Sequence, residues 1–135
     1  MSPPQSLVWF LRFTAVMFLA AAPAVVMPTS WMRVIADSYG LTLPETPLVE
    51  YLARSMSALY TTMGASYWFM SCDLRRYLPL LRFSIPVMFA FDATVIVLDV
   101  VIEMPILWTV GEAVAILTWT LALWWLVRRM EDYES

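Results

Sequence analysis

Four long apolar stretches are the feature that most restricts what this chain can fold into. A helix that crosses the hydrocarbon core of a bilayer needs about 20 mostly apolar residues, and each stretch is long enough. Backbone groups left unpaired inside a bilayer are costly, so spans of this kind must be helices. The sequence therefore predicts an all-α fold, a four-helix transmembrane bundle that forms a single domain over residues 1–135, with spans at about 7–26, 49–71, 80–102 and 107–127.

Composition supports a membrane protein and excludes several chemistries. Of the 135 residues, 61% are hydrophobic and 14% are charged, whereas a soluble domain is about half apolar and a quarter charged. The sequence has no His, no Lys, one Cys and three Gly. We therefore expect no His-based catalytic triad, no Schiff base, no iron–sulfur cluster, no metal site and no cofactor. The net charge of −3 argues against nucleic-acid binding.

Residues 27–48 form the one long connection between predicted spans. Thr29 or Ser30 can cap the start of a helix, apolar residues then recur at helical spacing, and Gly40 can end the helix. A short amphipathic helix with Trp31 at the level of the lipid headgroups is therefore predicted, with a plain ordered loop as the alternative.

Arginines are distributed unevenly around the predicted spans. Two pairs follow the second and fourth spans, Arg75–Arg76 and Arg128–Arg129. The first pair lies in a predicted tight turn at 72–79, where Pro79 suits the first turn of the third helix. Because cytoplasmic loops carry an excess of Arg and Lys, the sequence predicts that both termini are cytoplasmic and that segment 27–48 lies on the outer face.

Ionisable side chains inside the predicted spans are costly and therefore mark candidate sites. At about 1.5 Å of rise per residue, three of them reach one layer in the outer third of the bilayer. An Arg guanidinium can serve two carboxylates, so this layer can be an ion-pair lock that fixes helix register. It can equally be a polar pocket, open to the outer face, that binds a small ligand or handles a proton. The layer comprises Arg54, Asp99 and Glu112, with Tyr51, Tyr60 and Trp108 at similar depth.

Carboxylates outnumber cations inside the spans. Asp92, Asp99 and Glu103 fall within about 40° of each other on one face of the third helix, with Glu103 at the membrane interface. Arg12, in the inner third of the first span, can extend toward the cytoplasmic headgroups. Asp92 lies near mid-membrane with the least certain partner. We therefore expect Asp92 to hold a proton at neutral pH, as a candidate proton site.

Small residues repeat every four positions on the second span, and such a face lets helices approach closely. The face consists of Ala53, Ser57, Thr61 and Ala65. We expect it to pack inside the protomer, in a homodimer or against a protein partner, with the lipid bilayer around the remaining surface.

Three runs of sequence carry a resemblance to known proteins, at 51–60, 73–83 and 104–112. Through them the chain resembles, over nearly its whole length, a group of uncharacterised small bacterial four-helix integral membrane proteins. It is more loosely similar to DoxX-like proteins, through Leu11-Arg12 early in the first span. The resemblance implies the fold and a place in the bacterial inner membrane. DoxX-like relatives have been linked to quinone-coupled redox enzymes, but no catalytic motif transfers to this chain.

Three functions remain open from the sequence. The first is a membrane protein without catalysis of its own, which acts as a binding or accessory subunit built around the Arg54 layer. The second is a small-molecule or proton-coupled transporter, for which four helices would need to dimerise. The third is a membrane anchor of a quinone-linked oxidoreductase, whose redox centres would lie on its partners.

Overall fold

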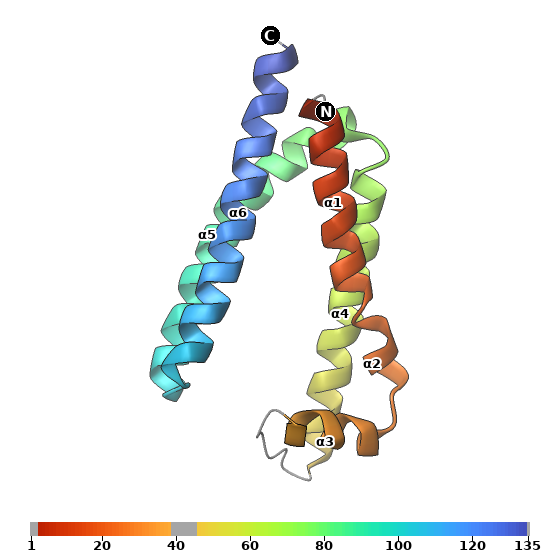
Figure 1. Cartoon of the computed structure of the whole chain (residues 1–135), viewed down its shortest axis with the longest axis vertical. Helices are drawn as coiled ribbons and strands as arrows, with labels where there is room; N and C mark the ends of the chain where they lie inside the picture. The colour runs from red at the N-terminus through yellow and green to blue at the C-terminus, as the bar shows by residue number, and fades with distance from the viewer. Residues whose placement is uncertain (1–2, 39–45, 135) are drawn as a thin grey trace. The chain divides into compact units, whose positions relative to one another are not determined.

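The computed structural model describes residues 3–38 and 46–134, and this part of the chain is helical almost throughout (Figure 1). The helices, in chain order, are α1 Pro3–Leu19, α2 Ala22–Val26, α3 Thr29–Ser38, α4 Pro47–Met70, α5 Leu74–Ile102 and α6 Ile106–Glu134. They fall into two compact units, one of residues 1–10 and 73–135 and the other of residues 11–72. Each unit is described by itself below.

Three helical segments in the described part of the chain are long and apolar enough to cross a membrane: Pro4–Val26, Leu74–Ile102 and Ile106–Tyr133. The prediction of an all-helical membrane protein is therefore confirmed. The second predicted span is present as α4, which has 24 residues but is not among the three. Its sequence explains this, because α4 carries Glu50, Arg54 and five Ser or Thr residues. The count of four spans stays a prediction.

The first predicted span is not one continuous helix. α1 ends at Leu19, and α2 starts at Ala22, after two intervening residues, with Pro23 in its first turn. Proline has no backbone N–H, so Pro23 cannot donate to the Leu19 carbonyl four residues earlier. The backbone tightens instead, with the Ala21 N–H donating to the Phe18 carbonyl at 3.1 Å and the Ala24 N–H donating to the Ala21 carbonyl at 3.0 Å. Pro23 therefore interrupts the helix and divides this apolar stretch into α1 and α2.

The predicted turn at 72–79 is wrong, because α5 already begins at Leu74. The Asp73 side chain accepts a hydrogen bond from the Arg76 backbone N–H at 3.3 Å and so caps the helix start. Pro79 and Pro86 then lie inside the helix, where each removes one backbone bond and favours a bend. Figure 1 shows the green first turns of α5 running obliquely to its cyan remainder.

α5 and α6 pack against each other as an antiparallel pair joined by residues 103–105. Glu103 ends α5 in the left-handed conformation, with φ 59° and ψ 42°. At the other end of the pair, Arg82 forms an ion pair with Glu131. α6 continues past the predicted limit at 127 as far as Glu134. The buried face of α5 has spacings of three, four and seven residues, as expected for a helix–helix seam, and consists of Leu74, Leu78, Leu81, Ile85, Asp92 and Asp99.

The predicted helix after the first span is present as α3, Thr29–Ser38. Gly40, its predicted end, lies outside the described residues. Only Ala36 of this helix is buried, whereas the exposed fractions of Trp31 and Val34 are 64% and 68%. α3 therefore leaves Trp31 and Val34 largely unpacked against the described residues. That it lies on the outer membrane face stays a prediction.

In the second unit, α1 and α4 approach each other closely at Gly64. A Cβ atom on Gly64 would lie 2.8 Å from the Ala15 carbonyl oxygen and 2.9 Å from both the backbone N and Cγ of Leu19. Aromatic rings extend this contact, since the Phe18 ring lies 5.6 Å from that of Tyr60 and 5.9 Å from that of Tyr67. Gly64, rather than the predicted small-residue face, provides the close approach. In that face Ala53 and Ala65 are exposed.

Candidate functional site

Arg54 lies at the centre of a polar site in the second unit. Its Nε and Nη2 atoms donate to the same Glu50 oxygen, Oε1, at 3.0 and 2.8 Å. Its Nη1 and Nη2 atoms also donate to the backbone carbonyls of Val25 and Met27, at 2.7 and 3.0 Å. These carbonyls are at the C-terminal end of α2, where helix carbonyls lack partners within the helix. The four bonds use four of the five N–H donors of Arg54.

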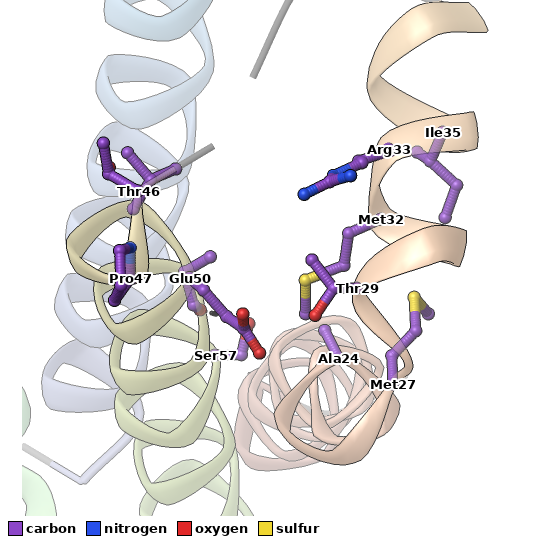
Figure 2. A pocket seen from close by; sticks show the side chains of 12 residues that line it. Ala24, Met27, Thr29, Met32, Arg33, Ile35, Thr46, Pro47, Glu50 and Ser57 are labelled. Carbon is purple, nitrogen blue, oxygen red and sulfur yellow. Dashed lines mark hydrogen bonds between the residues drawn. The ribbon is translucent and has the colours of Figure 1, made fainter. Parts of the chain in front are cut away.

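A partly open cavity of about 510 Å³ lies beside this ion pair, between α3 and the first turns of α4. Figure 2 shows Arg33, Met32 and Thr29 extending from α3 toward α4, and the Glu50 carboxylate pointing back at them. The size falls within the usual range for small-molecule sites, about 300–1,000 Å³. Among the described residues, the lining consists of Ala24, Met27, Thr29, Met32, Arg33, Ile35, Thr46, Pro47, Val49, Glu50, Ala53 and Ser57.

The cavity combines both signs of charge with an apolar wall. Glu50 interacts with Arg54, with the Thr29 hydroxyl and, at longer range, with the charge of Arg33. Thioether and aliphatic side chains, among them Met32, line the remainder of the wall. A mixed lining of this kind suits an amphipathic molecule, because its polar end can meet the charged side chains while its apolar part contacts the methionines.

The predicted outer layer is divided between the two units. Arg54 belongs to residues 11–72, while Asp99 and Glu112 belong to the other unit. The Glu112 carboxylate accepts a hydrogen bond from the Trp108 indole Nε1 at 3.1 Å, so these two predicted residues do meet. Arg54 has Glu50 as its carboxylate partner. A layer that joins Arg54 to Asp99 and Glu112 stays a prediction.

The two tyrosines predicted for this layer lie on α4. Tyr51 has 66% of its surface exposed and Tyr60 has 40%. Tyr60 packs against Phe18 through its ring. Neither tyrosine lines the cavity.

Asp92 and Asp99 are the most deeply placed carboxyl groups predicted for the spans. Their residues are 6% and 9% exposed, which places both in the buried seam of α5. Asp92 Oδ1 and Asp99 Oδ2 are enclosed and have no hydrogen-bond partner among the described residues. Buried polar atoms without a partner are uncommon in folded proteins and call for an explanation.

The remaining predicted charges are Arg12, in the interior of α1, and Glu103, at the end of α5. Arg12 donates from Nε to the Ser71 hydroxyl at 3.4 Å, and its guanidinium lies 5.5 Å from the centre of the Trp68 ring. These neighbours are at the end of α4 that leads into the turn before α5. Glu103 is exposed and forms the C-terminal cap of α5.

The two charged residues that line the cavity, Glu50 and Arg33, were not among the residues predicted from the sequence for a site. The signal for Glu50 is present in the sequence, because Glu50 precedes Arg54 by four residues, the spacing and order that favour an ion pair on one helix face. The position of Arg33 across from Glu50 depends on how α3 folds back over α4, and no local pattern encodes that contact.

No family model, curated protein or solved structure matches this chain.

Proposed function

We propose that this chain is a non-enzymatic, four-span membrane protein that acts as a binding or accessory subunit. Its binding site is the cavity between α3 and α4, and the ligand is a small amphipathic molecule with an anionic group. The observation that carries this proposal is the 510 Å³ cavity, with Arg33 on one wall and the Glu50–Arg54 pair on the other.

The path of α4 beside the first apolar segment supports a fourth span. Arg12 meets Ser71, Leu19 meets Gly64, and Met27 meets Arg54, so the two segments run antiparallel over much of their length. From Arg54 to Ser71 is about 26 Å of helix, close to the thickness of the hydrocarbon core. If Pro4–Val26 crosses the bilayer, its companion must cross as well.

The hydroxyl groups of α4 are compatible with that position. Ser57, Thr61, Thr62 and Ser66 each donate to the backbone carbonyl four residues earlier, at 2.8–2.9 Å. A hydroxyl satisfied by its own helix needs no water, so its cost in lipid is reduced. The lower hydropathy of α4 therefore does not prevent it from crossing a membrane.

The proposed orientation follows from the arginine ends of α5 and α6. The Arg82–Glu131 pair holds the start of α5 close to the end of α6, and both ends carry arginine pairs. The positive-inside tendency assigns this end to the cytoplasm. With four spans, both termini are then cytoplasmic in a bacterial inner membrane, and α3 and its cavity lie at the outer face.

Native mass spectrometry of the protein released from its own membrane in mild detergent tests the binding site. We expect the wild type to retain a small bound molecule, and Arg33→Gln to lose it because the anion-binding charge is gone. Arg76→Gln is the matched control, since Arg76 is an exposed arginine far along the chain from the cavity.

A second pair of variants tests the same cavity by volume. Ala53 lines it, so Ala53→Phe should displace the bound molecule. Ala58 lies on the same helix, is exposed and is not part of the lining, so Ala58→Phe should retain it. A bound mass that is unchanged in Arg33→Gln and in Ala53→Phe would place the ligand elsewhere and refute the proposal.

A further inference from the structure

The seam between α5 and α6 contains two carboxyl groups that the proposed cavity does not use. Asp92 and Asp99 are seven residues apart, so both point from the same face of α5, about 10 Å from each other along the axis. Both belong to the buried set of that helix. Each has an enclosed oxygen without a hydrogen-bond partner among the described residues.

Charge accounting within this unit excludes a neutralising arginine near either group. α5 has no basic residue after Arg82, and α6 has none before Arg128. The first ten residues, which complete the unit, contain no charged side chain. The other acidic groups along these two helical stretches are Glu103 and Glu112, which add negative charge. Within this unit, an ionised carboxylate in the seam would therefore lie buried without a counter-charge, which is strongly unfavourable.

The antiparallel pairing shows which part of α6 lies level with each group. The turn occupies residues 103–105. Residues of α5 and α6 that are equally far along the chain from the middle of this turn lie level with each other, so Asp99 is level with Thr109 and Asp92 is level with Ile116. Glu112 lies between these two levels, and its carboxylate accepts a hydrogen bond from the Trp108 indole N–H. Level with Asp92 the facing helix thus has the apolar Ile116, and level with Asp99 it has the Thr109 hydroxyl group, with Glu112 within about one turn of both.

A metal ion is a poor fit for these groups. A cation such as sodium or calcium needs several oxygen ligands at one point, whereas the two carboxyls are about two helical turns apart. No group of three His, Cys, Asp or Glu side chains that could hold an ion occurs in the described ranges 3–38 and 46–134. A proton needs only one carboxyl group.

Glu103 bears on how protons could reach the buried carboxyl groups from the surface. It occupies the left-handed position that ends α5, where glycine is the usual residue and another side chain costs about 1 kcal/mol. Its side chain is exposed, and it follows Asp99 by four residues. An acidic residue at this position can pass protons between the surface and the nearer of the two buried groups.

From this geometry we propose that Asp92 and Asp99 are two proton-binding sites in the α5–α6 seam, both occupied by a proton at neutral pH. The ligand class is the proton, and the exposed Glu103, four residues after Asp99, is the proposed surface group. This role does not depend on the cavity between α3 and α4, so either proposal can fail without the other.

A hydrophobic carbodiimide tests the proposal on the full chain in detergent micelles. The reagent dicyclohexylcarbodiimide reacts with protonated carboxyl groups in apolar surroundings. The carboxyl O–H adds across an N=C bond, so that the oxygen bonds to carbon and the proton moves to nitrogen. The acyl group then shifts from oxygen to nitrogen and leaves a stable N-acylurea, with no leaving group and no redox change. Peptide mass spectrometry locates the adduct.

We expect adducts on both Asp92 and Asp99 at pH 7, with labelling that declines as the pH rises. The exposed Asp73 should stay at least about tenfold less labelled. Asp92→Asn should remove only its own adduct and leave that on Asp99, while the melting temperature reports that the variant is folded. Asp92→Glu keeps the acid and should restore labelling, which protects the test if the Asn variant is unstable.

Three results would overturn the proposal. Absence of both adducts in the folded protein would show that the groups are ionised. An adduct on Asp92 alone would assign Asp99 to an ion pair, as the predicted layer with Arg54 requires. Protection by sodium, compared with choline at equal ionic strength, would show that a metal ion occupies the sites.

Discussion

Gly64 gives the most direct test of the packing between α1 and α4. The Cβ added by Gly64→Ala would lie 2.8 Å from the Ala15 carbonyl oxygen, while ordinary van der Waals contact begins at 3.4 Å. The two helices must therefore separate locally by about 0.6 Å. A gap of about 0.5–1 Å already forfeits a quarter to a half of the attraction at each contact.

The expected cost is about 1–3 kcal/mol, the usual range for an extra methyl group in a packed interface. Alanine favours a helix over glycine by up to about 1 kcal/mol, which offsets part of the loss. We therefore expect a net destabilisation of about 1–2 kcal/mol, measured as a lower midpoint of thermal unfolding in detergent. Gly111→Ala is the matched control, because a Cβ there has no neighbour within 4 Å. It should leave the midpoint unchanged or raise it slightly.

The identity of the neighbouring atoms permits a sharper check. Two of the three nearest atoms are backbone atoms, the Ala15 oxygen and the Leu19 nitrogen, and only the Leu19 Cγ belongs to a side chain. Leu19→Ala removes that side-chain contact but leaves both backbone contacts in place. It should therefore fail to rescue Gly64→Ala. Equal midpoints for Gly64→Ala and Gly111→Ala, or full rescue by Leu19→Ala, would refute the close backbone approach.

Three further predictions follow from the same structure. Arg54→Ala should lower stability by about 1–3 kcal/mol more than Arg33→Ala, because it leaves Glu50 and two helix-end carbonyls without their donor; equal unfolding midpoints would contradict this. Glu103→Gly should raise stability by about 1 kcal/mol by relieving its left-handed backbone, and a lower midpoint would show that the side chain stabilises the fold. An alkaline phosphatase fused to the C-terminus should be inactive if that terminus is cytoplasmic, whereas clear activity would reverse the proposed orientation.

Local chemistry explains which boundaries the sequence could supply. The apolar stretches predicted the long helices because their length and the absence of polar connections are properties of the linear chain. Pro79 predicts a later start for α5, because proline is common in the first turn of a helix. The Asp73 cap, six residues earlier, determines the actual boundary. α6 extends to Glu134, and in this added stretch Glu131 meets Arg82, a contact between residues 49 positions apart in the sequence.

For the candidate sites, the sequence likewise indicates the charged residues but not the groups that they contact. Arg54, Asp92 and Asp99 were identified from sequence alone, since a charge within an apolar stretch is conspicuous and its cost is general. The sequence did not predict the partners of Arg54, because an arginine with five N–H donors can satisfy many sets of acceptors. Arg54 bonds to carbonyls of α2 only because Pro23 breaks the first apolar segment and frees the end of a helix there.

The sequence by itself determined that this chain is a helical membrane protein, because hydrophobic length and the cost of unpaired backbone groups are set by composition and order. Tertiary structure decided the cavity between α3 and α4, the approach at Gly64 and the burial of Asp92 and Asp99. Each of these depends on which helix faces meet, and that choice is made by packing between residues far apart in the sequence.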